Sequence, residues 1–167
     1  MESAVHAKLN SYLTFRIGEE EYGAHVSEVI NILELQEITK VPKAPDYMKG
    51  VINLRGKVLP VIDTRVKMGL SPIEYTESTC IIVMELHFNH EEILIGALVD
   101  EVKAVLELDE NEMEDAPGIG SVFTSKFIRN MAKVGDRFIM ILDLIKLFSL
   151  EETRELQNIN TQQQTNK

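Results

Sequence analysis

Short runs of apolar residues that alternate with polar ones cover most of the chain. Residues 12–17 alternate strictly, a turn follows at Gly18, and residues 21–24 resume the alternation. Because successive side chains of a β-strand point to opposite faces, such a pair of runs predicts a β-hairpin. Three more pairs have the same form, at residues 51–54 with 58–62, 81–86 with 93–95, and 131–134 with 138–142. The sequence therefore predicts an all-β protein, a sandwich or barrel.

Helical signals are few and short. Asp63 and Asp143 each follow a strand-like run and precede a short amphipathic stretch, at residues 64–68 and 144–148. An aspartate in this place caps a helix, because its carboxylate accepts hydrogen bonds from unpaired backbone N–H groups of the next turn. A pair of catalytic carboxylates is the alternative. Pro60, inside an apparent strand, predicts an edge strand or a bulge.

An internal repeat divides the chain. YGAHVSEVINIL (residues 22–33) and IGALVDEVKAVL (residues 95–106) align without gaps and share Gly, Ala, Val, Glu, Val and Leu. A hairpin followed by an aspartate comes after each segment, in matching order. We interpret this as two similar β-subdomains, residues 12–70 and 78–150, with exchange of edge strands between them left open. A groove between two such units is a common binding site.

Composition and charge exclude several classes of protein. Hydrophobic residues make up 44% and charged residues 26%, the balance of a globular chain with a core. A net charge of −10 argues against nucleic acid and anionic membranes as partners, and favours a basic patch on another protein. No apolar run approaches the roughly 20 residues of a membrane span. With a single cysteine, Cys80, and no signal-peptide pattern, these features predict a cytoplasmic protein without membrane insertion.

Residues 1–11 are expected to be an N-terminal extension, and the polar residues 157–167 a disordered tail.

The sequence predicts no catalytic residue, no metal and no cofactor. His87, His90, Glu91 and Glu92 place two imidazoles and two carboxylates close together, but in a loop between strands, where a solvated turn is favoured over a metal site. The glycine-rich residues 117–121 lack the third glycine and the preceding strand of a dinucleotide-binding motif. No nucleophile motif is present. An active site assembled only by the fold is the alternative.

The most informative segment is ITKVPKAPDYMKGVINLRGKVLPVID, residues 38–63. Its prolines stiffen the approach, and Gly50 permits an unusual backbone angle before a strand. Arg55 then stands at a turn between apolar strands. A guanidinium held at a turn suits recognition of a carboxylate or of backbone carbonyls, and an ordinary exposed turn residue is the alternative.

This segment resembles the CheW family, the coupling proteins of bacterial chemotaxis. The similarity lies first in GVINLRGKVLPVID (residues 50–63), with ITKVPKAP just before it. YLTFRIGEEEYG (residues 12–23), IGALVDEV (residues 95–102) and VGDRFIMILDLIKL (residues 134–147) resemble the family's opening hairpin, midpoint motif and closing strand and helix. The resemblance therefore extends over almost the whole chain, residues 12–150.

The resemblance implies two five-stranded SH3-like barrels packed around a shared core. It also implies a stand-alone, non-enzymatic adaptor that couples transmembrane chemoreceptors to the histidine kinase CheA. The receptor's cytoplasmic hairpin tip is expected in the groove between the subdomains, and the kinase's regulatory domain, itself CheW-like, is expected to pack barrel against barrel. The residues carried over for the receptor are Val29, Gly50, Asn53, Leu54, Arg55 and Gly56, and those for the kinase are Ile38 and Val41.

One position departs from the family pattern. Asn31 stands where the family commonly has a glutamate that could pair with a receptor arginine or with Arg55. Either the receptor differs, or Glu28 or Glu34 takes over this charge. The alternative function is a β-barrel module for an unrelated protein or for nucleic acid. An aromatic fraction of 6% without tryptophan argues against the nucleic-acid case.

Overall fold

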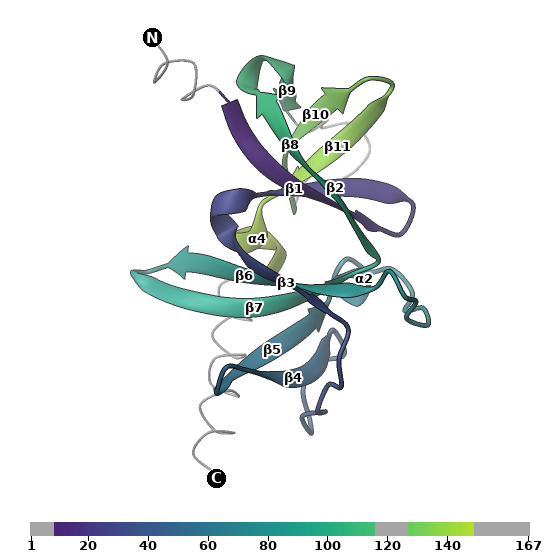
Figure 1. The fold of residues 1–167 in the computed structure, drawn as a ribbon, viewed down its shortest axis with the longest axis vertical. Coiled ribbons are helices and arrows are strands. Elements are labelled where there is room, and N and C mark those ends of the chain that lie inside the picture. The colour runs from purple at the N-terminus through teal and green to yellow at the C-terminus, as the bar shows by residue number, and fades with distance from the viewer. Residues whose placement is uncertain (1–8, 116–126, 149–167) are drawn as a thin grey trace.

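The computed structural model describes residues 9–115 and 127–148 (Figure 1). The predicted tail, residues 157–167, and the glycine-rich residues 117–121 lie outside these ranges. The strands are β1 (Leu9–Ile17), β2 (Glu20–His25), β3 (Val29–Glu34), β4 (Met48–Leu54), β5 (Lys57–Asp63), β6 (Cys80–Phe88), β7 (Glu91–Val99), β8 (Glu101–Asp109), β9 (Met113–Asp115), β10 (Ile128–Val134) and β11 (Arg137–Leu142). The helices are the 3₁₀ turns η1 (Val26–Glu28) and η2 (Glu110–Glu112) and the short α-helices α2 (Thr64–Lys67) and α4 (Leu144–Phe148).

The four predicted hairpins are all present, as β1–β2, β4–β5, β6–β7 and β10–β11. The strands form two sheets, with the orders β8-β1-β2-β11-β10-β9 and β3-β6-β7-β5-β4. We call them sheet A and sheet B. The mostly-β fold class is therefore confirmed, with sheet A at one end of the long axis and sheet B at the other (Figure 1).

The sheets do not follow the predicted subdomain boundaries. Each sheet takes strands from both predicted ranges, 12–70 and 78–150, because β3, β4 and β5 join β6 and β7 while β1 and β2 join β8 and the last strands. The turn inside a hairpin is local in sequence, whereas the pairing of one hairpin with another is not. The first strand also begins at Leu9, inside the predicted extension 1–11.

The registers bear out the internal repeat. In sheet B, β7 runs parallel to β5 with Gly96 opposite Val61, shortly before Asp63. In sheet A, β2 runs parallel to β11 with Gly23 opposite Ile141, at the same spacing before Asp143. The two glycines thus occupy equivalent places, and so do the two aspartates.

Both aspartates cap the helix that follows them, as predicted. The Asp63 carboxylate accepts hydrogen bonds from the backbone N–H of Arg65 (2.9 Å) and of Val66. The Asp143 carboxylate accepts one from the N–H of Lys146 at 3.1 Å. Because each carboxylate is used by the first turn of its helix, capping accounts for both residues and the catalytic alternative is not needed.

Three apolar clusters hold the molecule together. One cluster is formed by side chains of sheet B and includes Leu59 and Val83. A second is formed by side chains of sheet A and includes Tyr12 and Ile139. The largest lies between the sheets, and its buried members come from sheet A, from sheet B and from α4: Leu13, Phe15, Ile17, Met84, Leu86, Ile95, Leu147 and Phe148 among others. Two curled sheets around a shared core agree with the predicted architecture, except that sheet A has six described strands where five were predicted.

Pro60 does not lie on an edge strand. Its strand, β5, lies between β4 and β7. The described ladder with β7 begins only at Val61, and Pro60 is opposite Val51 of β4 on the other side. The missing N–H of proline falls just before the parallel ladder, and the register of β4 with β5 shifts next to it, between Met48 and Gly50, so the structure supports the predicted bulge and not the predicted edge.

Candidate partner-binding surfaces

The predicted receptor residues from Gly50 to Gly56 lie on the β4–β5 hairpin. Arg55 and Gly56 form its turn with φ of 52° and 85°, the positive angles of a type I′ turn. The Asn53 side-chain carbonyl accepts a hydrogen bond from the Gly56 N–H at 2.8 Å and holds the turn closed. Arg55 is exposed, and within the described residues no acidic side chain forms an ion pair with it. The turn is as tight as predicted, and its guanidinium faces solvent.

Gly50 has a structural reason to be glycine. Its φ is 149°, and a Cβ there would lie 2.1 Å from the carbonyl oxygen of Thr39 and 2.9 Å from a methyl carbon of Ile38. Thr39 exchanges two backbone hydrogen bonds with Val51, at 2.9 and 2.8 Å, so the chain after β3 lies beside β4. The predicted receptor position Gly50 and the predicted kinase position Ile38 are therefore in contact.

Val29 lies elsewhere, at the start of β3. It pairs with Met84 of β6 and packs against the shared core, whereas Leu54 packs against the core of sheet B. The structure thus separates Val29 from the other predicted receptor residues. The hairpin β4–β5 lies at the end of sheet B that is remote from sheet A (Figure 1). A location of Arg55 in the groove between the sheets is not supported by this arrangement.

The outer face of β3 and the adjoining η1 expose large apolar side chains. Exposed fractions are 36% for Val26, 53% for Ile30 and 43% for Ile32. Val29, Asn31 and Leu33 alternate with Ile30 and Ile32 and are less exposed. We call Val26, Ile30 and Ile32 the β3 apolar strip. The sequence does not distinguish this strip from core residues, because apolar alternation alone does not say which face of an edge strand is covered.

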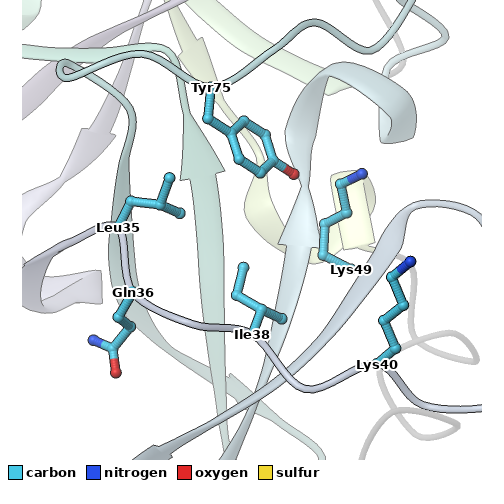
Figure 2. Close-up of a pocket in the computed structure, with 6 residues that line it drawn as sticks. All are labelled: Leu35, Gln36, Ile38, Lys40, Lys49 and Tyr75. Atoms are coloured by element: carbon cyan, nitrogen blue, oxygen red, sulfur yellow. The ribbon is translucent and has the colours of Figure 1, made fainter.

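Ile38 and Val41 lie on the segment between β3 and β4. Val41 packs against the shared core, and Ile38 against the core of sheet B. Ile38 also lines a pocket of about 270 Å³, whose other residues are Leu35, Gln36, Lys40, Lys49 and Tyr75 (Figure 2). The Lys49 ammonium lies 5.6 Å from the centre of the Tyr75 ring. Burial raises the pKa of the Tyr75 hydroxyl, and the neighbouring Lys49 opposes this rise. The pocket therefore combines an apolar floor with two lysines.

Within the described residues, neither Glu28 nor Glu34 forms an ion pair with Arg55. The Asn31 side chain accepts a hydrogen bond from the Ile32 N–H at 2.8 Å. Glu28, on η1, is half buried, and desolvation raises the pKa of its carboxyl. Arg129 and His87 lower that pKa and Asp143 raises it, so Glu28 senses charges from both sheets.

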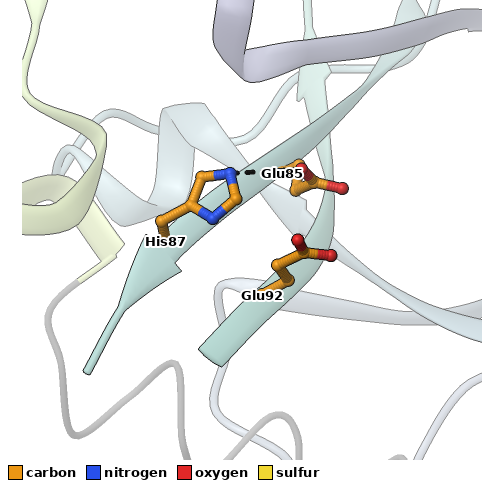
Figure 3. Close-up of side chains that lie close together, drawn as sticks. All are labelled: Glu85, His87 and Glu92. Carbon is orange, nitrogen blue, oxygen red and sulfur yellow. Dashed lines mark ion pairs between the residues drawn. The ribbon is translucent and has the colours of Figure 1, made fainter. Parts of the chain in front are cut away.

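Metal-ligating side chains meet on the β6–β7 hairpin, although the sequence predicted no metal site there, and the group differs from the four residues that are close in sequence. Glu85, His87 and Glu92 each offer a ligand atom, and these atoms lie within 4.8 Å of one another (Figure 3). The His87 Nε2 is 3.2 Å from a Glu85 carboxylate oxygen. His90 sits in the turn with a φ of 65° and is not part of the cluster.

Comparison with protein-family models tests the family resemblance that the sequence motifs indicated. The model of the CheW-like domain matches residues 11–152, which include both sheets. The chain belongs to the CheW-like domain family. The resemblance stated from sequence is thereby confirmed.

Relatives of this CheW-like chain match over nearly their whole length. The chain is 33% identical over 148 residues to the chemotaxis protein CheW of Klebsiella aerogenes, covering 89% of this chain and 87% of that one. It is 34% identical to CheW of Bacillus subtilis over 142 residues, with 85% and 88% covered. The crystal structure of the scaffolding protein TtCheW from Thermoanaerobacter tengcongensis superposes with a TM-score of 0.75 at 31% identity, covering 86% and 94%.

Proposed function

We propose that this protein is a chemotaxis coupling protein, a non-enzymatic adaptor that joins transmembrane chemoreceptors to the histidine kinase CheA. The main support for this function is the match to the CheW-like domain family across residues 11–152, which span both sheets and the shared core. The relatives are named chemotaxis and scaffolding proteins, which favours an adaptor over a module for an unrelated ligand. Within the described residues, no helix is long and apolar enough to cross a membrane. The adaptor acts in the cytoplasm and reaches the membrane through the receptors.

The β3 apolar strip is the proposed apolar part of the receptor-binding surface. Val26, Ile30 and Ile32 would each lose water on contact with an apolar helix face, worth about 25 cal/mol per Å² buried. Val29 supports the strip from the core side of the same strand. A contiguous apolar strip on an edge strand is typical of an interface, and the occupant is the helical hairpin tip of a receptor.

Arg55 remains the proposed polar receptor contact. Its guanidinium is exposed at a closed turn, so it can pair with a carboxylate or with helix C-terminal carbonyls of the tip. Asn53, Leu54 and Gly56 hold the turn or pack beneath it, and Gly50 fixes β4 against the Thr39 segment. The resemblance implied that these four residues contact the receptor, and the role proposed here is that they position Arg55.

The segment with Ile38 and Val41 is the proposed kinase-binding surface. Ile38 lines the pocket beside Lys40 and Lys49, which gives an apolar surface with a basic rim on an acidic protein. A barrel of the kinase's regulatory domain with an acidic and apolar surface would complement it.

Calorimetry with each partner separately tests these assignments. The variants are Ile30→Ser and Arg55→Ala, and Phe138→Ser is the matched control, since Phe138 is 47% exposed on sheet A. Each is titrated with a receptor cytoplasmic fragment and with the CheA regulatory domain. We expect Ile30→Ser to weaken receptor binding roughly tenfold and Arg55→Ala roughly thirty-fold, about 1.4 and 2 kcal/mol. Kinase affinity and the control should stay within about twofold.

Other outcomes reassign or reject the surfaces. If Arg55→Ala lowers kinase affinity and leaves receptor affinity intact, the β4–β5 turn belongs to the kinase surface together with Ile38. If Ile30→Ser and Phe138→Ser weaken receptor binding equally, the β3 apolar strip is not the receptor site. If the unmodified protein binds neither partner, the coupling function itself is wrong.

A further inference from the structure

The backbone of the β6–β7 hairpin sets three ligating side chains on one face. Glu85 and His87 are two residues apart on β6, so they share a face, and Glu92 of β7 lies directly opposite His87. Figure 3 shows the imidazole beside both carboxylates, which come from two neighbouring strands. We call Glu85, His87 and Glu92 the hairpin cluster. We propose that the hairpin cluster binds a divalent transition-metal ion of the zinc class.

The spacing suits tetrahedral coordination. Zn²⁺ lies about 2.0–2.2 Å from nitrogen and oxygen ligands, which places neighbouring ligand atoms roughly 3.4 Å apart. The His87 Nε2 and the Glu85 oxygen are already 3.2 Å apart, and all three ligand atoms lie within 4.8 Å. Glu92 is exposed, so rotation of its side chain can close the remaining distance. Water completes the fourth position.

The ligand set selects the kind of metal. An imidazole nitrogen favours Zn²⁺, Ni²⁺ or Cu²⁺ over Mg²⁺ and Ca²⁺, which prefer oxygen ligands alone. Two carboxylates balance the charge of the ion, and the net charge of −10 favours the approach of a cation. The register of the two strands fixes the backbone beforehand, so only side-chain freedom is lost on binding.

The bound ion would cross-link β6 to β7 near the turn of their hairpin. His87 and Glu92 are followed by only one more described pair, Phe88 with Glu91, before the turn. An ion held by both strands binds the folded hairpin and not the unfolded chain, so it raises the melting temperature as its concentration exceeds its dissociation constant. This proposal revises the expectation from sequence that no metal binds.

Titration of the full-length, chelator-treated protein with Zn²⁺ tests the proposal, with Mg²⁺ as the comparison ion. His87→Ala removes a ligand, and His90→Ala removes the neighbouring turn imidazole as the matched control. Because His87 is exposed, with 64% of its side chain accessible, its replacement leaves the core untouched, and circular dichroism checks this. We expect one Zn²⁺ per chain, at least tenfold weaker binding in His87→Ala, and unchanged binding in His90→Ala.

The thermal shift gives a second readout. Saturating Zn²⁺ should raise the melting temperature of the unmodified protein and of His90→Ala, but not of His87→Ala. Equal zinc affinity in the His87→Ala and unmodified proteins would overturn the proposal, since the ion would then sit elsewhere. Binding absent up to millimolar Zn²⁺, or equally strong for Mg²⁺, would overturn it as well.

Discussion

At the scale of single residues, Asp100 joins the two sheets. It lies between β7 of sheet B and β8 of sheet A, and it is 6% exposed. Its carboxylate accepts a hydrogen bond from the Gly18 N–H in the β1–β2 turn and another from the Arg65 guanidinium of α2, each at 2.8 Å. Its own N–H donates to the Arg16 carbonyl at 3.0 Å. The buried Asp100 thus contacts the β1–β2 turn and helix α2 through its carboxylate, and the end of β1 through its backbone N–H.

Asp100→Ala should therefore be strongly destabilising. It leaves the Gly18 N–H without its acceptor and the largely buried Arg65 without its carboxylate, a loss of about 2–4 kcal/mol in the free energy of unfolding. Glu101→Gln is the matched control. Glu101 pairs with Arg16 and Lys103 at the surface, so its loss should stay within about 0.5 kcal/mol. Urea denaturation measures both values. Equal losses of unfolding free energy in the two variants would show that the buried contacts of Asp100 stabilise the fold no more than the surface ion pairs of Glu101.

At the scale of elements, hairpins and caps could be predicted from sequence because their signals are local. Gly18 and the pair Arg55-Gly56 mark turns within a few residues, and Asp63 contacts the next helical turn. The exchange of strands between sheets was not predictable, since it depends on pairings such as β1 with β8 that lie far apart in the chain.

For the candidate sites, too, local features could be predicted from sequence and features that depend on distant strands could not. The place of Arg55 at a tight turn followed from its neighbours. The β3 apolar strip did not, because which face of β3 is covered depends on the packing of Val29 and Leu33 against cores formed by distant strands. Of the hairpin cluster, His87 and Glu92 could be named from sequence but Glu85 could not, because closeness in sequence groups His87 with His90 and Glu91. Strand alternation instead places His87 beside Glu85.

The equivalent glycines of β2 and β7 give a prediction for the repeat. A Cβ at Gly23 would lie 2.9 Å from the terminal carbon of Ile141, which can move aside. A Cβ at Gly96 would lie 2.9 Å from the Cγ2 methyl of Ile81 and 3.2 Å from a terminal carbon of Leu59. Both alanine variants should lose about 1–3 kcal/mol, and Gly96→Ala should lose more because a methyl bonded directly to Cβ moves less freely than the end of the side chain.

Denaturation of both variants tests this, with Gly56→Ala as the control. A methyl group added at Gly56 would have no atom within 4 Å, so only the φ of 85° opposes alanine there, at about 1 kcal/mol. If neither strand variant is less stable than Gly56→Ala, close packing of the parallel pairs does not explain these glycines.

At the scale of the whole molecule, the two sheets depend on each other. The shared core takes buried side chains from both, including Phe15 of β1, Met84 of β6 and Phe148 of α4. Each sheet also needs strands from both halves of the sequence. We therefore expect that the two halves of the internal repeat do not fold separately, and that an adaptor built this way presents its surfaces in a fixed relation to each other.

Cutting the chain in the exposed loop before β6 tests this dependence. A fragment of residues 1–75 keeps β1 to β5 but lacks β8 and β11 for sheet A and β6 and β7 for sheet B. Residues 76–167 lack the complementary strands, so each fragment exposes unpaired edges and half of the shared core. We expect neither fragment to show a cooperative thermal transition by circular dichroism, and the intact chain to unfold in a single one. A fragment that melts cooperatively would show that one sheet is complete without its interleaved strands, and that the halves are independent domains after all.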